Sequence, residues 1–275
     1  RHISLVFPGQ GSQSVGMLDD FSLEEISSIK PALTELPFDL IDIIQNNPED
    51  LLNKTSITQP ALLATSYLHY KKFLTLTDTR PDIMAGHSLG EYSALVAADS
   101  IKLKNAISLV HKRGLLMESS EKGSMFAILN LDLSLVKDIC NEVSVSTGLI
   151  VSPANINSPN QIVIAGNEEA ALIVADRCKE AGAKRCIQLK VGAASHCMLM
   201  KAASESLLSE LSAIHFNELS IPIIHNYDVS IELSCKNVVD KLTSQLTCPV
   251  KWIDTMNLIK EFNGSIIECG PGRVL

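Results

Sequence analysis

The sequence lacks the charge balance of a nucleic-acid binder. Its 275 residues include 23 lysines and arginines against 31 aspartates and glutamates, a formal net charge of −8. A protein that binds nucleic acid normally presents a basic face, so this balance argues against that function. No apolar stretch reaches the length of a membrane span, and no signal-peptide pattern opens the chain. Internal repeats and low-complexity segments are missing too.

Paired cysteine motifs are absent as well. The seven cysteines form no C-x-x-C pair, and their spacing favours neither a zinc site nor a disulfide framework. We therefore expect free buried thiols in a reducing cytoplasm, and no metal. Cys197 follows His196, a candidate base. A redox or nucleophilic thiol and a small packing residue both fit that position.

Strands alternate with helices along most of the chain, which indicates a mainly parallel α/β sheet. Strands are expected at 2–7, 82–86 and 265–268, and helices at 57–76, 102–118, 198–214 and 252–262.

Between residues 125 and 191 the pattern becomes strand–helix–strand–strand–helix–strand, with the final strand expected at 185–191. A strong turn signal, Asn157-Ser158-Pro159-Asn160, separates the two middle strands. This order is typical of a ferredoxin-like unit. We therefore expect a small ferredoxin-like unit at 125–191, inserted in a large α/β-hydrolase-like unit formed by 1–124 and 192–275.

The most informative motif is Gly86-His87-Ser88-Leu89-Gly90. An apolar strand precedes it and a helix, Glu91–Ala98, follows it, which is the context of a nucleophile elbow. The turn strains the serine and exposes its hydroxyl, while glycines let the strand and helix approach closely. The helix N-terminus favours developing negative charge. Ser88 is therefore a candidate nucleophile.

A serine hydroxyl is a weak nucleophile and requires a base within hydrogen-bond reach. Among seven histidines, His196 follows a Gly-Ala-Ala-Ser loop where the inserted unit ends, and a base or a structural role fits its position. His87 adjoins the serine, and we expect it to brace the elbow. No carboxylate stands out as the partner of the base. Asp228 and Asp254 are candidates, and Gln245 could accept the histidine N–H through its amide carbonyl.

Two further segments could bind substrate. Arg113 lies on a predicted helix, where it either faces solvent or points into the site to clamp a carboxylate with two hydrogen bonds. Gly9-Gln10-Gly11 offers backbone N–H groups after a strand, which suit an oxyanion hole. A phosphate-facing loop is the alternative, but the lysine of a P-loop is absent.

Several short motifs occur in one order along essentially the whole chain. They are Phe7-Pro8-Gly9-Gln10-Gly11-Ser12-Gln13, Gln59-Pro60-Ala61-Leu62, Gly86-His87-Ser88-Leu89-Gly90-Glu91, Asn157-Ser158-Pro159, Ser195-His196, Gln245-Leu246, Pro249-Val250 and Gly270-Pro271-Gly272. Together they resemble the malonyl-CoA:acyl-carrier-protein transacylases of fatty-acid synthesis. In that family more sequence follows the last motif, so we expect the chain to continue beyond Leu275.

The resemblance implies a role for each matching residue. Ser88 would be the nucleophile that becomes malonylated, and His196 its general base and acid. Gln245 would hold the histidine through a carbonyl, in place of an acidic residue. The remaining matches would bind the acyl group: backbone N–H groups of Gln10 and Leu89 would form the oxyanion hole, and Arg113 would bind the free carboxylate of malonyl.

The resemblance also implies a reaction and its partners. A malonyl group would pass from malonyl-CoA to Ser88, then to the phosphopantetheine thiol of acyl carrier protein, with no cofactor. Carrier proteins of the family are acidic, so docking would require a basic patch. Lys184, Arg185, Lys190 and Lys201 could form it, or they could be ordinary solubilising charges. We expect a cytoplasmic monomer.

Three other functions are compatible with parts of the sequence. A serine esterase or thioesterase would use the same elbow with water as acceptor, but Gln245 and Arg113 speak against it. A carrier-binding subunit without activity would not require Ser88, His196 and Arg113 together. A transferase of polyketide assembly would share most of the motifs, and only substrate tests would separate it from a fatty-acid enzyme.

Overall fold

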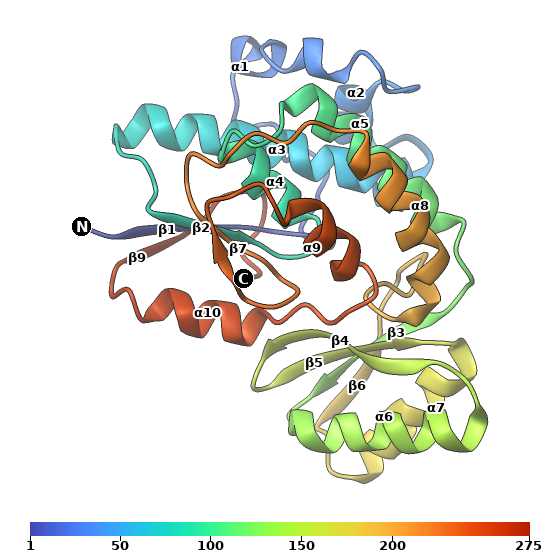
Figure 1. Ribbon diagram of the computed structural model, residues 1–275. Coiled ribbons are helices and arrows are strands. Elements are labelled where there is room, and N and C mark those ends of the chain that lie inside the picture. Colours follow the sequence, from blue (N-terminus) through green and yellow to red (C-terminus); the bar gives the residue numbers. More distant parts are fainter.

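The computed structural model describes residues 1–275 and forms two sheets (Figure 1). The larger sheet has the order β8-β7-β2-β1-β9, with β1 (Ile3–Phe7), β2 (Ile83–Gly86), β7 (Ile223–Ile224), β8 (Ile231–Glu232) and β9 (Ser265–Glu268). All pairings in it are parallel except that of β8 with β7 at the edge. The predicted parallel sheet is therefore confirmed.

Helices cover both faces of this sheet. They are α1 (Leu23–Ser27), α2 (Leu40–Asn46), α3 (Thr55–Thr77), α4 (Gly90–Ala97), α5 (Leu103–Glu118), α8 (Lys201–Ser212), α9 (Val238–Gln245) and α10 (Trp252–Lys260), with 3-10 turns η1 (Lys30–Leu33), η2 (Pro48–Asn53) and η3 (Met198–Met200). None is both long enough and apolar enough to cross a membrane.

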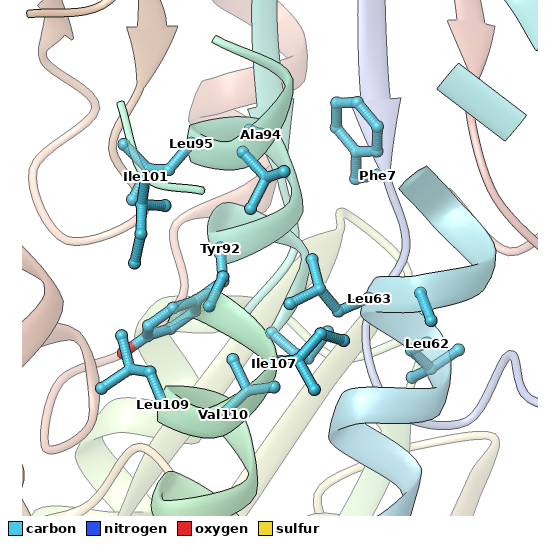
Figure 2. Close-up of a cluster of buried hydrophobic side chains, with 14 of the residues drawn as sticks. Phe7, Leu62, Leu63, Tyr92, Ala94, Leu95, Ile101, Ile107, Leu109 and Val110 are labelled. Atoms are coloured by element: carbon cyan, nitrogen blue, oxygen red, sulfur yellow. The ribbon is translucent and has the colours of Figure 1, made fainter. Parts of the chain in front are cut away.

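The alternation of side chains along β1 assigns the two faces. Leu5 and Phe7 belong to the main hydrophobic core with α3, α4 and α5, whereas Val6 packs with Trp252 and Ile259 of α10. Successive strand residues point to opposite faces, so one strand contributes to both layers. Figure 2 shows part of the main core, in which apolar side chains of α3, α4 and α5 meet. This layer holds α4, and with it the elbow, against the sheet.

The smaller sheet is antiparallel and has the order β4-β5-β3-β6. Its elements are β3 (Ser124–Leu129), α6 (Leu133–Thr147), β4 (Val151–Ser158), β5 (Gln161–Gly166), α7 (Glu168–Glu180) and β6 (Arg185–Gln188). Both helices pack on one face through an apolar cluster. The other face contacts Ala194, Cys197 and Leu199 of the larger part. Cys197 is thus buried, and burial raises the pKa of its thiol to about 11.

The two parts of the chain are joined by main-chain hydrogen bonds as well as by packing. Beside β4, the N–H of Ile156 donates to the carbonyl of Val250 (3.0 Å), and the N–H of Val250 donates to that of Ala154 (2.8 Å). Figure 1 shows α10 running alongside this junction, between the two sheets.

Several expected boundaries were wrong by a few residues. β4 continues through Ser158, so the turn is confined to Pro159 and Asn160, and the strand expected at 185–191 ends at Gln188. The helix expected at 198–214 is divided between η3 and α8. The short elements α9, β7 and β8 were not predicted.

Candidate active site

The elbow motif forms the connection between β2 and α4. Ser88 has φ +54°, a left-handed conformation that costs a non-glycine residue energy. The flanking glycines are required by space: a Cβ on Gly86 would lie 1.9 Å from the carbonyl carbon of Gly90, and a Cβ on Gly90 would lie 2.2 Å from the carbonyl oxygen of Phe7. Strand and helix therefore approach closely enough to project Ser88 from the end of the sheet.

His196 lies directly against the serine. Its Nε2 is 2.7 Å from Ser88 Oγ, although the two residues are 108 positions apart. On the other side of the ring, Nδ1 is 2.7 Å from the main-chain carbonyl oxygen of Gln245, which can only accept. Nδ1 is therefore the protonated nitrogen, and Nε2 presents a lone pair to the serine hydroxyl. This geometry lets His196 remove the proton from Ser88.

Gln245 supports the histidine differently from the sequence-based expectation. We expected its side-chain amide carbonyl to accept from His196, but the main-chain carbonyl makes that contact. The side chain instead lies under the elbow, where Nε2 donates to the carbonyl of Ser88 (3.0 Å) and Oε1 accepts from Arg113 (3.0 Å). Gln245 thus contacts His196, Ser88 and Arg113.

The surroundings of His196 favour its neutral form. The side chain is buried, and this burial, followed by the positive charge of Arg113, lowers its pKa to about 3. Neither carboxylate considered from the sequence contacts it: Asp228 pairs with Lys241 at 3.0 Å, and Asp254 is exposed on α10. A neutral imidazole at ordinary pH is the form that a general base requires.

His87 lies beside the elbow without contacting Ser88 Oγ. Its Nε2 is 2.7 Å from Asn157 Oδ1 of β4, and its ring packs at a tilt against Trp252 with centroids 5.2 Å apart. Burial lowers the pKa of His87. These contacts suit the bracing role expected from the sequence.

Arg113 is a buried cation with no carboxylate partner. Only 1 % of the residue is exposed, so a solvent-facing role is excluded. Its guanidinium donates to Gln59 Oε1 (2.8 Å) and Gln245 Oε1, lies 3.4 Å from Ser88 Oγ, and leaves Nε without an acceptor. The ring of Tyr92 lies 5.3 Å from the guanidinium carbon. An unpaired buried charge is costly, so this site favours an anionic ligand next to the serine.

Two main-chain N–H groups near the serine are free to bind an oxyanion. Those of Gln10 and Leu89 have no hydrogen-bond acceptor within the protein, and both residues line the pocket. The loop that carries Gln10 must lie close to the elbow, because a Cβ on Gly9 would be 2.4 Å from the carbonyl oxygen of His87.

The pocket has a volume of about 630 Å³ and is lined by both parts of the chain. Ser88 and Arg113 contribute from the larger part, and Met125, Leu189 and Lys190 from the smaller. The volume lies in the usual range for small-molecule sites.

The four basic residues singled out from the sequence are not equally close to this pocket. Lys190 lines it, whereas Lys184 and Arg185 are exposed at the opposite end of β6. Lys201 is exposed at the start of α8.

Three buried residues behind the elbow were missed by the sequence analysis. Glu91, His225 and Asn226 are all 0 % exposed, and the side chain of Asn226 accepts from the N–H of Ser88 (2.8 Å). Glu91 could have been noticed because it is the one charged residue of α4. Nothing in the sequence around His225 and Asn226 indicates this contact, because they lie far along the chain.

Known proteins are similar to this chain over nearly its full length. Residues 4–257 match the family model described as acyl transferase domain. The chain is 43% identical over 286 residues to the malonyl CoA-acyl carrier protein transacylase of Haemophilus influenzae, covering 100% of this chain and 90% of the relative. It is 42% identical over 281 residues to the protein of the same name from Escherichia coli strain K12, covering 99% and 90%.

Solved structures of malonyl transferases are also similar to this chain. One is described as a type II PKS acyl-carrier protein in complex with its malonyl-transacylase, with a TM-score of 0.95, 44% identity, and coverage of 100% of this chain and 90% of that one. Another is an acyl carrier protein S-malonyltransferase from Vibrio cholerae, with a TM-score of 0.93, 41% identity, and coverage of 99% and 90%.

Proposed function

Because the chain belongs to the acyl transferase family and resembles its malonyl-CoA:acyl-carrier-protein transacylases over its full length, we propose that this acyltransferase moves malonyl groups from malonyl-CoA to acyl carrier protein. The observation that carries the choice of malonyl is Arg113, a buried guanidinium without a counter-ion 3.4 Å from the candidate nucleophile. A malonyl thioester brings the missing negative charge. An uncharged acyl group would leave Arg113 unpaired.

The first half-reaction loads the enzyme. His196 Nε2 takes the proton of Ser88 Oγ, which attacks the thioester carbonyl of malonyl-CoA. The resulting oxyanion accepts hydrogen bonds from the N–H groups of Gln10 and Leu89. Loss of one such donor typically slows a reaction by about 100- to 1000-fold. The carbon–sulfur bond then breaks, His196 returns the proton to the departing CoA thiolate, and a malonyl ester remains on Ser88.

The second half-reaction reverses these roles with a different thiol. The phosphopantetheine thiol of the carrier protein gives its proton to His196 and attacks the ester on Ser88. A second tetrahedral oxyanion collapses, the carbon–oxygen bond breaks, and His196 protonates Ser88 Oγ. Arg113 holds the malonyl carboxylate through both halves with two hydrogen bonds, a geometry that lysine cannot supply.

The finer architecture forms part of the same proposal. We assign residues 125–191 to a ferredoxin-like unit, supported by the order β4-β5-β3-β6 with both helices on one face. Residues 1–124 and 192–275 then form an α/β-hydrolase-like unit, supported by the strand–elbow–helix geometry at Ser88. The site lies between these units.

The carrier protein would approach over the mouth of the pocket. Lys190 is best placed to attract an acidic carrier, because it alone among the four basic residues lines the pocket. Lys184 and Arg185 would contact only a partner that extends along β6. We further propose a cytoplasmic monomer that supplies fatty-acid elongation.

Intact-protein mass spectrometry tests the reaction. The enzyme is mixed briefly with malonyl-CoA and then chased with holo acyl carrier protein. A malonyl adduct on the Ser88 peptide that moves to the carrier thiol is the expected result. An adduct lost mainly to water would indicate a hydrolase, and no adduct at all would refute malonyl as the acyl group.

A further inference from the structure

A buried carboxylate behind the elbow is not used by the reaction scheme above. Glu91 lies in the first turn of α4 and is 0 % exposed. Its Oε1 accepts from the main-chain N–H of Asn226 at 2.9 Å and lies 3.4 Å from Gln245 Nε2. Its Oε2 is 3.0 Å from Nδ1 of His225. Each oxygen of this carboxylate therefore contacts a group on a distant segment of the chain.

The two amide side chains next to Glu91 hold the main chain of the nucleophile. Asn226 Oδ1 accepts from the N–H of Ser88 at 2.8 Å, and Asn226 Nδ2 donates to the carbonyl of Gly86 at 2.6 Å. Gln245 Nε2 donates to the carbonyl of Ser88 at 3.0 Å. A left-handed serine persists only where its surroundings hold it there. These contacts restrain both peptide groups of Ser88.

Gln245 also connects Glu91 to the base. The main-chain carbonyl of Gln245 fixes His196 Nδ1, while its side chain lies between Glu91 and Ser88. In a Ser-His-Asp triad the carboxylate contacts the histidine directly. Here the nearest carboxylate, Glu91, contacts neither reacting side chain. Through Gln245 it is connected to the main chain of Ser88 and to the ring of His196.

His225 holds the carboxylate in place from behind. It is 0 % exposed, and its second ring nitrogen, Nε2, faces Glu232 Oε2 at 3.4 Å, an ion-pair distance with poor hydrogen-bond alignment. Because a carboxylate oxygen accepts, His225 donates its Nδ1 proton to Glu91 Oε2 and so fixes the orientation of that carboxylate.

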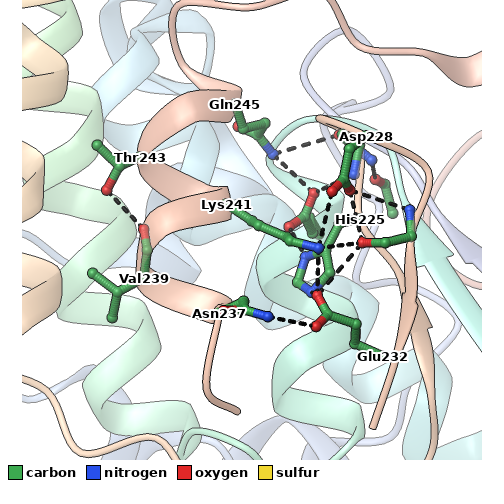
Figure 3. A network of polar contacts seen from close by, with 12 residues as sticks. His225, Asp228, Glu232, Asn237, Val239, Lys241, Thr243 and Gln245 are labelled. Carbon is green, nitrogen blue, oxygen red and sulfur yellow. Dashed lines mark hydrogen bonds and ion pairs between the residues drawn. The ribbon is translucent and has the colours of Figure 1, made fainter. Parts of the chain in front are cut away.

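The groups around His225 form a cluster of charged side chains. Figure 3 shows the ring among Asp228, Glu232 and Lys241. Lys241 pairs with Asp228 at 3.0 Å and with Glu232, and Asn237 donates to Glu232 at 2.8 Å. Burial opposes the ionisation of Glu232, but these hydrogen bonds and the charges of Lys241 and His225 lower its pKa.

We propose that Glu91 and His225 are positioning residues for acyl transfer. The hydrogen bond between them fixes the Glu91 carboxylate, which holds Asn226 and Gln245, and these in turn hold Ser88 and His196 in the geometry for attack. The inference rests on the proposed role of Ser88 as nucleophile, and it assigns the function of the missing triad acid to a carboxylate that contacts neither the serine oxygen nor the histidine.

Single-turnover acylation of Glu91→Gln and His225→Gln tests the proposal. Glu91→Gln preserves shape but removes the charge opposite His225, and a displacement of about 1 Å at a reacting group can cost on the order of 100-fold in rate. We expect about that loss in the acylation rate constant for Glu91→Gln, and about 10-fold for His225→Gln. The KM for malonyl-CoA should change less than about 3-fold, because neither residue faces the substrate.

Asp228→Asn is the matched control. It removes a carboxylate from the same cluster but contacts neither Glu91 nor the two amides, so we expect wild-type acylation. Thermal unfolding of each variant shows whether it is folded. A folded Glu91→Gln with wild-type acylation would overturn the proposal. If Glu91→Gln does not fold, His225→Gln decides by the same criterion, and if neither folds, the pair is a structural element and the proposal fails.

A second readout separates this inference from the proposed function. The labelling rate of Ser88 by a fluorophosphonate depends on the serine and its base but not on recognition of malonyl. Slower labelling of Glu91→Gln than of wild type supports positioning, and equal labelling contradicts it. If wild-type enzyme is labelled by the fluorophosphonate but forms no malonyl adduct, the malonyl assignment fails while the positioning proposal is still decided by labelling.

Discussion

The two sides of the nucleophile elbow treat charge in opposite ways. On the pocket side, Arg113 is buried with only neutral acceptors around it. On the far side, His225 lies between Glu91 and Glu232, and Lys241 pairs with Glu232. On the far side each carboxylate already has a hydrogen-bonding or ionic partner in the free protein, whereas on the pocket side the cation gains a counter-ion only when an anion binds.

This difference predicts where changes affect chemistry and where they affect folding. Substitutions on the pocket side should lower activity with little effect on stability, because the groups there are poorly paired in the free protein. Substitutions among the paired charges of the far side should lower stability first. The residues that connect the two sides, Glu91 and His225, are the exception proposed above.

Ser88→Ala should have the largest effect. Removing the nucleophile removes the ester intermediate, and loss of a catalytic serine can cost about 10⁶-fold in rate. Mass spectrometry after mixing with malonyl-CoA should show no adduct, and transfer to carrier protein should be undetectable. Retained transfer would remove Ser88 from the mechanism.

Arg113→Ala should discriminate between acyl groups. Loss of a buried charge-assisted pair costs about 2–5 kcal/mol, so kcat/KM for malonyl-CoA should fall by about 30- to 5000-fold. Acetyl-CoA has no carboxylate, and its turnover should fall much less. Equal losses for both donors would show that Arg113 does not bind the carboxylate. Arg113→Lys is the matched variant: it should restore part of the malonyl rate, since it keeps the charge without the two-pronged geometry.

Lys241→Met should lower the stability of the fold and leave acylation nearly unchanged. The variant leaves Asp228 and Glu232 without their cation in a partly buried cluster, which should cost about 1–3 kcal/mol of unfolding free energy. Urea denaturation at pH 7 measures this loss. Acylation should stay within about 3-fold of wild type. A loss of acylation without a loss of stability would contradict the division between the two sides.

The pH profile should show the smallest effect. The pKa of His196 in the free protein is lowered to about 3, by burial first and by the charge of Arg113 second. Protonation removes the base, so kcat/KM should fall only as the pH drops well below the 6.5 of an ordinary histidine. A bound malonyl carboxylate offsets the charge of Arg113, which should raise the pKa in the complex. The acid limb of kcat should therefore lie at higher pH than that of kcat/KM, and coinciding limbs would argue against this coupling.

The sequence predicts the parts of the fold that depend on local pattern. Long periodic helices such as α3 and α5, and the apolar strands β1 and β2, were expected close to their observed bounds. β7 and β8 have two residues each and exist because they pair with neighbouring strands. Such pairing leaves no signal in two residues of sequence.

In the candidate site, too, contacts between distant segments could not be predicted from local sequence. The sequence singled out Ser88, His196 and Arg113, and the structure brings their side chains together. The role of Gln245 could not be predicted in detail, because its contact with His196 uses a main-chain atom that every residue has. Asn226 contacts Ser88 across 138 positions of sequence, so only the folded chain shows that contact.

The hydrogen-bonded junction beside β4 holds the two parts of the chain together next to Asn155, which lines the pocket. Main-chain hydrogen bonds join Ala154 and Ile156 to Val250, and the contact of His87 with Asn157 lies close by. Under the proposed function, a pocket mouth fixed in this way would admit the two large thiol carriers one at a time. CoA would then depart before the carrier protein delivers its thiol, so free CoA and carrier protein should compete for the loaded enzyme. The direction of net transfer then depends on which of the two thiols is in excess.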